Sequence, residues 1–479
     1  MTEATTVNLL EEPAQNPLPH HDWGPWVVEM RALLRLAGPI VVTQLAQMGV
    51  GTIDVLMLGA YSKDALAASA LGLSLYYAMW LFGMGPAVAV SPMIAHILGE
   101  RRNGIAGVRA SVRMALWALI LLTPIFAVFI WFVGDILLAL GEPERLSREA
   151  GVFVRLLGIG LPFTLAFSIL RGYATALSHP RAPLIVQIVT VFFNAAIAYA
   201  LIFGHFGAPR LGLEGAGIAT ALSSIFSFLA MIAIIYATPE LRRYRIFRRF
   251  FRPQLEKLRE VFRLGLPIGF TMIFEAMFFN AGALMMGYFG TASVAAHQVA
   301  LNVCALFFMV PLGIATAASV RVGLAAGARD MPRVRRAGTA ALALSVTLMT
   351  LAGIVMAIFP KEIVGLYIDA HNPDNADVVE LATVFLRVGA AFQLFDSIQV
   401  TMGISLRGLK DANFPMMLAG GSYWLFGFPV ALYLAFHLHL EGFGVWIAFV
   451  LALFVVAVSM TARFAWLSGA IGRRGLVSA

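Results

Sequence analysis

Three carboxylates lie inside segments of the sequence that are otherwise apolar. They are Asp54 in GVGTIDVLMLG, Glu275 in TMIFEAMFFNAG and Asp396 in FQLFDSIQV. A charged aspartate at the centre of a membrane helix costs about 2.5–3.5 kcal/mol on insertion scales, so three such residues indicate a hydrated or ion-binding environment. Removal from water favours the neutral form of a carboxyl group, which can then exchange a proton near neutral pH, whereas the ionised form can hold Na⁺ or an organic cation. Two cations that compete for the same carboxylates can be exchanged, as in an antiporter.

Other polar side chains in apolar segments are weaker candidates. Asn194, in VTVFFNAAIAYALIFG, is a candidate partner of Asp54. Gln298 and Asn302 are spaced i, i+4, which places both on one helix face. A single Asn or Gln in a membrane helix more often joins two helices through hydrogen bonds, and this alternative stays open for all three residues.

The composition predicts an integral membrane protein that carries these residues on helices. Hydrophobic residues form 60% of the 479 positions, charged residues form 13%, and the mean hydropathy is +0.84. Apolar runs long enough to cross a hydrocarbon layer of about 30 Å recur along the chain. Because lipid cannot satisfy backbone polar groups, we expect helices rather than strands. The predicted spans are 32–58, 66–98, 108–133, 152–175, 183–204, 214–237, 261–288, 293–323, 335–359, 380–407, 413–436 and 442–467.

Lysine and arginine gather in every second predicted loop, which indicates the orientation of the chain. The basic clusters lie at 101–113, 171–181, 242–263, 321–336 and 407–410. Both terminal segments, 1–31 and 468–479, are therefore expected in the cytoplasm, with the spans in a bacterial inner membrane. These loops account for the formal charge of +8, so no nucleic-acid partner is expected. A regulatory or anionic-lipid role of the arginines at 242–252 is an alternative.

The chain also contains a duplication. LAGPIVVTQLAQMGVGTIDVLMLGAY from Leu36 aligns without a gap with LGLPIGFTMIFEAMFFNAGALMMGYF from Leu264, at an offset of 228 residues. Two lobes of six helices are predicted, at 32–237 and 261–467, joined by a basic cytoplasmic linker at 238–260. Six is even, so both lobes insert in the same orientation and are related by a pseudo-twofold axis along the membrane normal. The cleft expected between them is a transport path.

The acids are not part of the duplicated scaffold, because no acid is shared by the two copies. The alignment pairs Glu275 with Gln47, Asp54 with Gly282, Asp396 with Thr164, Gln298 with Ala70 and Asn302 with Ser74. One lobe therefore has a single acid, and the other has two. Gln47, the counterpart of Glu275, joins the candidate substrate contacts.

Five segments, taken in order, resemble the NorM-like branch of the multidrug and toxic compound extrusion (MATE) family. They are IDVLMLG at 53–59, GAGIATA at 215–221, AAHQVALNV at 295–303, FQLFDSIQ at 392–399 and LRGLKDANFP at 406–415. The resemblance covers about 32–467, and the joint occurrence of the segments is specific. It implies a cation-coupled exporter of organic cations with two lobes that form an outward-open V.

The resemblance also implies roles for individual residues. Asp54 matches the first-helix acid of the family, and Glu275 and Asp396 match the seventh- and tenth-helix acids that are associated with Na⁺ or H⁺ binding. Gln298 and Ser74 match positions associated with substrate contact.

Two positions depart from the family pattern. Ala198 stands where a second asparagine often follows the one at Asn194, and Phe392 stands where some members have a tyrosine before the tenth-helix acid. Each departure removes one candidate ligand, so the identity of the coupling ion stays open.

The candidate sites therefore fall into two sets. The cation-binding set is Asp54, Glu275, Asp396 and Asn194, of which Glu275 and Asp396 are the Na⁺ ligands if sodium is coupled. The substrate-binding set is Asp54, Gln298, Asn302, Ser74, Asp396 and Gln47.

The leading hypothesis is a multidrug efflux antiporter that exports cationic or amphipathic organic compounds in exchange for Na⁺ or H⁺ by alternating access. We expect no cofactor, and organic cations and membrane lipids as the partners of a monomer. A lipid-linked glycan flippase of related architecture is the alternative, but it should place several basic residues in the cleft, whereas the charges expected to be buried here are acidic. A channel is a further alternative. No enzyme is expected, because HExxH and Walker A motifs are absent and Cys304 is the only cysteine.

Overall fold

A computed structural model describes residues 24–100, 104–369 and 372–474 of the chain. These residues form helices and no strand, and twelve helical segments among them are long and apolar enough to cross a membrane. The fold class predicted from the hydropathy is therefore confirmed. Most of the expected N-terminal segment 1–31 lies outside the described residues, as do residues 475–479 of the tail.

The first half of the chain contributes six spans and two short helices. The spans are α1 (Gly24–Tyr61), α2 (Lys63–Gly99), α3 (Gly104–Trp131), α5 (Glu144–Ala176), α6 (Arg181–Phe203) and α7 (Leu213–Ala237). The short helices are α4 (Val133–Ala139) and α8 (Pro239–Arg242). We call α1–α7 the N-lobe.

The second half repeats this pattern. Its spans begin with α9 (Leu255–Met286), α10 (Thr291–Gly327), α11 (Met331–Ile358) and α13 (Ala376–Gly408), and they end with α16 (Glu441–Arg474); the short helix α12 is Pro360–Gly365. The eleventh span, Asn413–His437, joins α14 (Asn413–Ala419) and α15 (Phe428–Leu432) through π-helical turns at Gly420–Gly427 and Tyr433–His437. We call α9–α16 the C-lobe.

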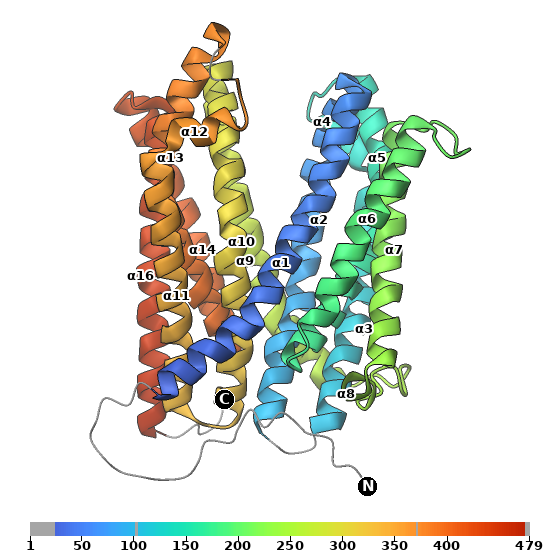
Figure 1. The fold of residues 1–479 in the computed structure, drawn as a ribbon, viewed down its shortest axis with the longest axis vertical. Coiled ribbons are helices and arrows are strands. Elements are labelled where there is room, and N and C mark those ends of the chain that lie inside the picture. Colours follow the sequence, from blue (N-terminus) through green and yellow to red (C-terminus); the bar gives the residue numbers. More distant parts are fainter. Residues whose placement is uncertain (1–23, 101–103, 370–371, 475–479) are drawn as a thin grey trace.

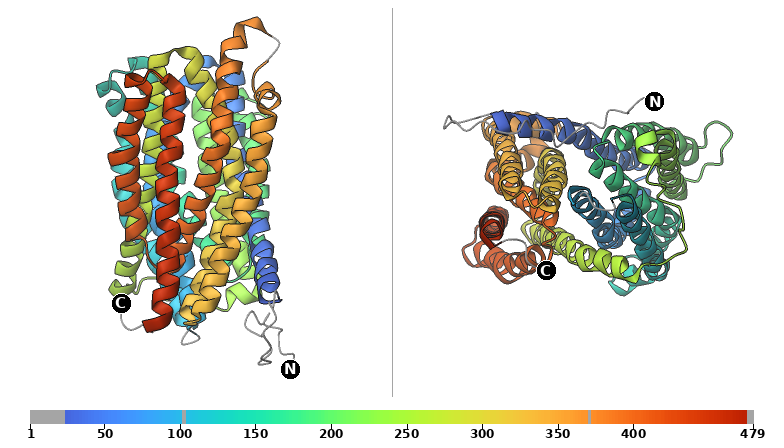
Figure 2. Two further views of the ribbon diagram at one scale, coloured as in Figure 1. Left: turned by 90° about the vertical axis from the view of Figure 1, so that its left-hand side faces the viewer. Right: turned by 90° about the horizontal axis from the view of Figure 1, so that it is seen from below.

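The two lobes are separate bundles that diverge toward the upper end of the molecule in Figure 1. The main hydrophobic cluster of each lobe is built almost entirely from its own helices. The first helix of each lobe nevertheless leans on the other lobe, and the view from below in Figure 2 shows α1 and α9 crossing between the bundles on opposite sides. Leu33 and Ile40 of α1 pack in one cluster with Ile314 of α10, while Leu264 of α9 belongs to the cluster of the N-lobe.

Glycines let the lobes meet at the lower end. Gly99 and Gly327 occupy equivalent positions in the two copies, and a Cβ placed on Gly99 would lie 2.9 Å from the Cα of Gly327. Nearer the middle, a Cβ on Gly85 of α2 would lie 2.6 Å from the backbone nitrogen of Gly269 in α9. Real Cβ contacts are longer than this, so the backbones of the two lobes can approach so closely only because these positions lack side chains.

A buried ion pair also joins α1 to the C-lobe. Arg321 of α10 donates from Nε to Glu29 Oε1 at 2.7 Å and from a terminal nitrogen to Glu29 Oε2 at 2.5 Å. Glu29 is 5% exposed and Arg321 is 6% exposed. The sequence predicted α1 to begin at residue 32 and assigned Arg321 to the basic loop clusters. Both expectations are corrected, because α1 begins at Gly24 and its first turns carry Glu29 across to Arg321.

We expect Glu29→Gln to lower the melting temperature of the purified protein. The substitution leaves the Arg321 guanidinium buried without its counter-charge, at a cost of about 3–5 kcal/mol. Differential scanning fluorimetry measures the shift, and Glu100→Gln, at an exposed glutamate after α2, is the matched control. A double variant, Glu29→Met with Arg321→Met, should recover most of the loss, because it removes both charges. A double variant that melts as low as the single one would contradict the assignment.

Candidate functional site

The two acids of the C-lobe form one cluster. Glu275 lies on α9 and Asp396 on α13, and Gln399 lies one helical turn after Asp396. The side-chain amide of Gln399 donates to Glu275 Oε1 at 2.7 Å and to Asp396 Oδ1 at 3.3 Å. Asp396 is 4% exposed and Gln399 is 5% exposed. One amide therefore bridges two carboxylates in a buried site, and the structure brings together the two residues predicted as Na⁺ ligands.

An arginine that the sequence counted with a basic loop cluster, at the end of the predicted span 380–407, lies near these acids. Arg407 is inside α13, one residue before the helix ends, and interacts electrostatically with Glu275. The equivalent residue in the N-lobe, Arg171 of α5, donates to the side-chain oxygens of Gln44 and Gln47 at 2.8 Å each. Because Gln47 is the counterpart of Glu275, each lobe places an arginine against the same position of its first helix. The two arginines therefore belong to the helix packing of the lobes and not to the exposed loop clusters.

The single acid of the N-lobe has a different set of neighbours. Asp54 of α1 accepts a hydrogen bond at 2.6 Å from the hydroxyl of Thr220 in α7. Asn194 of α6 is fully buried and lies close enough to Asp54 to interact with it, as the sequence suggested, but its amide makes no side-chain hydrogen bond of normal geometry. Asp54 Oδ1 and both polar atoms of the Asn194 amide are buried without a partner among the described residues. This site therefore has unused hydrogen-bonding and ligand capacity.

The two departures from the family pattern are offset by other residues. Ala198 is buried and offers no ligand near Asp54, but the hydroxyl of Thr220 takes a place beside the carboxylate. Phe392 packs edge-on against Phe279 and Trp446, and Gln399, on the other side of Asp396 along the helix, supplies the polar contact. In this chain the polar group beside each acid is therefore Thr220 for Asp54 and Gln399 for Asp396.

The side chains of the remaining substrate candidates make no hydrogen bond to these clusters among the described residues. Gln298 is exposed, and the Asn302 amide donates to the Gln298 backbone oxygen at 2.9 Å within α10. Ser74 is exposed, and its hydroxyl donates to the backbone oxygen of Leu71 in its own helix at 2.7 Å. Asn302 and Ser74 therefore bond within their own helices and do not join two helices, and the exposed side chain of Gln298 is open to a ligand.

Sequence reasoning missed the residues that complete the acid sites. Thr220 was present in the GAGIATA segment and Gln399 in FQLFDSIQ, but each was read only as part of a family pattern. Gln399 could have been found by its i, i+3 spacing from Asp396. Tyr77 of α2, which is 47% exposed and interacts electrostatically with Asp54, gave no comparable signal.

No group of three His, Cys, Asp or Glu side chains suitable for a metal ion occurs in the part of the chain that the structure describes. The chemistry of the sites is instead that of carboxylates with amide or hydroxyl neighbours. No Lys or Arg nitrogen among the described residues lies within ion-pair distance of Asp54, Glu275 or Asp396. Such oxygen-rich sites can accept a proton or a hard monovalent cation.

Comparison with known proteins agrees with this arrangement. The MatE family model matches residues 39–200 and 267–433, which correspond to the two lobes. A probable multidrug resistance protein NorM of Mesorhizobium japonicum is 41% identical over 440 residues, which cover 92% of this chain and 94% of the relative. The protein of the same description from Brucella suis is 39% identical over 439 residues, covering 92% and 93%.

The fold is also shared with solved structures. The crystal structure of a MATE protein in complex with MaL6 superposes with a TM-score of 0.84 at 19% identity, covering 93% of this chain and 97% of that one. The match of the family model to both lobes and the identity to the relatives over nearly the whole chain establish the family. The chain belongs to the MatE family and is a NorM-like MATE transporter that passes through the membrane several times.

Proposed function

We propose that the protein is a multidrug efflux antiporter, which exports cationic or amphipathic organic compounds in exchange for Na⁺ or H⁺ by alternating access. The observation that carries this proposal is the pair of acid sites, one in each lobe, in which no carboxylate is neutralised by an ion pair. The names of the relatives, probable multidrug resistance proteins, support the same substrate class. Catalysis has no part in the proposal.

In the C-lobe, the bridge made by Gln399 gives the exchange a physical basis. The amide nitrogen of Gln399 donates a hydrogen bond to one oxygen of Glu275 and one to an oxygen of Asp396. A proton or Na⁺ that enters the cluster neutralises a carboxylate. The hydrogen bond from the Gln399 amide to that carboxylate then weakens, or the amide rotates away from it. The packing around α9 and α13 then changes with the occupancy of the site. A coupling step of this kind requires that ion binding favours one arrangement of the helices over another.

In the N-lobe, the free oxygen of Asp54 supplies the second binding point. The Thr220 hydroxyl donates a hydrogen bond to Oδ2 of the carboxylate, and Oδ1, near Asn194, has no partner among the described residues. A cationic substrate or a coupling ion can occupy Oδ1, but the two cannot occupy it together. Tyr77, which interacts electrostatically with the same acid, is an aromatic residue of the kind that can contact an organic cation.

The orientation follows from the charge of the loops. The lower end in Figure 1, where the lobes meet, carries the basic clusters that the positive-inside rule assigns to the cytoplasm of a bacterial inner membrane. The lobes diverge at the opposite end, so this conformation is the outward-facing member of the cycle. Both termini are then cytoplasmic, and we expect the protein to act as a monomer.

The flippase alternative predicts several basic side chains free to hold a diphosphate. The structure corrects the expectation that the buried charges are all acidic, because Arg113 and Arg321 are buried and Arg171 and Arg407 are half-buried within helices. Arg171 donates to Gln44 and Gln47. Arg407 interacts electrostatically with Glu275 and its side chain makes no hydrogen bond or ion pair among the described residues, but one such arginine is fewer than the several basic groups that a diphosphate site needs. Efflux of cations therefore remains the better supported function.

Ethidium efflux from proteoliposomes, under separately imposed Na⁺ and pH gradients, tests the proposal as a whole. Export driven by either inward gradient and abolished when the gradient is collapsed supports antiport and names the ion. Ethidium movement that follows its own gradient regardless of Na⁺ and pH would reject antiport.

Replacing Asp396 with Asn should abolish ethidium efflux while membrane expression stays intact. Asparagine retains an oxygen that can accept the bond from Gln399, so the helix packing is kept and only the charge is lost. Asp377→Asn, at an exposed position near the start of the same helix, is the matched control and should transport normally. Undiminished efflux by Asp396→Asn would remove this residue from the mechanism.

Replacing Glu275 with Gln should weaken coupling more than substrate binding. The variant places a glutamine beside Arg407, which is the arrangement that the N-lobe already has at Arg171 and Gln47, so folding should be preserved. Release of bound ethidium by pulses of Na⁺ or acid measures the coupling, and Glu256→Gln, exposed at the start of α9, is the control. Equal responses of wild type and Glu275→Gln would count against the assignment.

A further inference from the structure

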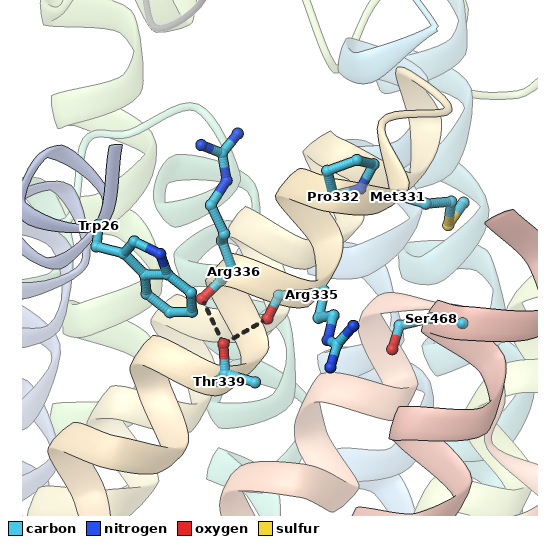
Figure 3. A pocket seen from close by; sticks show the side chains of 8 residues that line it. Trp26, Met331, Pro332, Arg335, Arg336, Thr339 and Ser468 are labelled. Carbon is cyan, nitrogen blue, oxygen red and sulfur yellow. Dashed lines mark hydrogen bonds between the residues drawn. The ribbon is translucent and has the colours of Figure 1, made fainter. Parts of the chain in front are cut away.

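A pocket of about 810 Å³ lies at the lower end of the C-lobe, outside the acid sites (Figure 3). It is formed where α11 begins and α16 ends, next to the first turn of α1. The indole of Trp26 and the side chains of Met331 and Pro332 give it an apolar wall, and Arg335 and Arg336 give it a positive charge. None of the residues that line the pocket is acidic.

The two arginines of the pocket have no counter-charge among the described residues. The hydroxyl of Thr339 donates to the backbone oxygen of Arg335 at 2.7 Å and to that of Arg336 at 3.2 Å, but neither guanidinium makes an ion pair within the described part of the chain. In Figure 3 the side chain of Arg335 extends toward Ser468, while that of Arg336 lies on the side of Trp26. The basic groups therefore flank the pocket from two directions, which suits a ligand with several anionic oxygens.

A second groove of about 500 Å³ repeats the combination on α1. Its lining residues are Val27, Met30, Arg31, Leu34 and Arg35, again apolar and basic without an acid. The outward side of the same helix exposes apolar side chains, with Val27 56% and Val28 58% exposed. In a membrane protein, apolar side chains exposed beside unpaired arginines mark the boundary between acyl chains and headgroups.

We propose that the pocket between α1, α11 and α16 binds an anionic phospholipid of the leaflet on that side. The guanidinium groups of Arg335 and Arg336 hold the phosphate oxygens, for which their planar donors are suited. The indole of Trp26 lies at headgroup level, and Met331 and Pro332 contact the upper part of an acyl chain. The basic clusters at this end already place it at the leaflet whose anionic lipids attract arginine and lysine.

A lipid bound in this way connects three helices. Trp26 is one turn before Glu29, which pairs with Arg321, so the lipid contacts α1 directly beside the ion pair that joins it to the C-lobe. Occupancy should therefore stabilise the contact between α1 and the C-lobe. This inference depends on the position of the pocket in the membrane and not on the transport function.

The full-length protein is purified in detergent and titrated with phosphatidylglycerol or phosphatidylcholine, with bound lipid counted by native mass spectrometry and melting followed by scanning fluorimetry. We expect phosphatidylglycerol to bind more tightly and to raise the melting temperature. Arg335→Gln with Arg336→Gln should weaken phosphatidylglycerol binding roughly 10- to 30-fold, from about 1 kcal/mol for each arginine. Arg259→Gln with Arg263→Gln, an exposed arginine pair on α9 at the same end of the molecule, is the matched control and should bind as wild type.

Two results would overturn the proposal. One is equal affinity for phosphatidylglycerol in wild type and the Arg335/Arg336 double variant, provided both melt alike without lipid. The other is occupation of the pocket by the acidic residues Glu3, Glu11, Glu12 and Asp22 of the same chain. In that case, replacing these four by their amides would lower the melting temperature as much as the arginine double variant does, without any lipid present. Inorganic phosphate at millimolar concentration should not reproduce the effect of the lipid, because it lacks the acyl chains.

Discussion

The hydrocarbon layer offers no hydrogen bonds, so every polar group within it must find a partner inside the protein or remain available for a ligand. The backbone meets this constraint by forming helices. The buried side chains meet it one by one. Arg321 is neutralised by Glu29, and Arg171 is held by Gln44 and Gln47. The acids are only partly satisfied, and Asp54 keeps one buried oxygen without a partner. A polar group that the protein leaves incomplete in such a place is the group expected to act in transport.

The duplication explains how a symmetric scaffold supports an asymmetric function. The contacts that hold the lobes together at the lower end follow the pseudo-twofold relation, because Gly99 meets its own counterpart, Gly327. The arginine on the fourth span of each copy also follows it, but it donates a hydrogen bond to Gln47 in one lobe and interacts only electrostatically with Glu275 in the other. The first helices of the two lobes thus differ at this position by an amide in place of a carboxylate. The amide, Gln47, makes a structural contact, whereas the carboxylate, Glu275, belongs to a candidate ion site. Similarly, Asp396 has Thr164 as its counterpart, and Thr164 bonds only to a neighbouring hydroxyl and its own helix.

The lower end of the molecule combines three kinds of contact that a transport cycle must change together. Close backbone packing of glycines, the ion pair between Glu29 and Arg321, and the apolar cluster of Leu33 and Ile40 with Ile314 all join α1 or α2 to the C-lobe. The proposed lipid pocket lies at the same end and contacts the same first turns of α1. Lipid composition could therefore influence how tightly this end is held, through contacts that are separate from the acids.

The sequence by itself determined the number of spans and their duplication. It also identified the three acids, because charged residues are rare inside apolar spans. Each of these can be read along one chain, because hydrophobicity sets the spans and the order of residue types reveals the duplication and the acids. The tertiary structure decided which side chains complete the acids, namely Thr220 for Asp54 and Gln399 for the pair Glu275 and Asp396. It also showed that Arg171, Arg321 and Arg407, which the sequence counted with the basic loop clusters, lie within helices, and it gave Arg171 and Arg321 specific partners. Such partners depend on how each helix is rotated and shifted against its neighbours, and several rotations bury the same apolar surface equally well, so the pattern of a single sequence does not specify them.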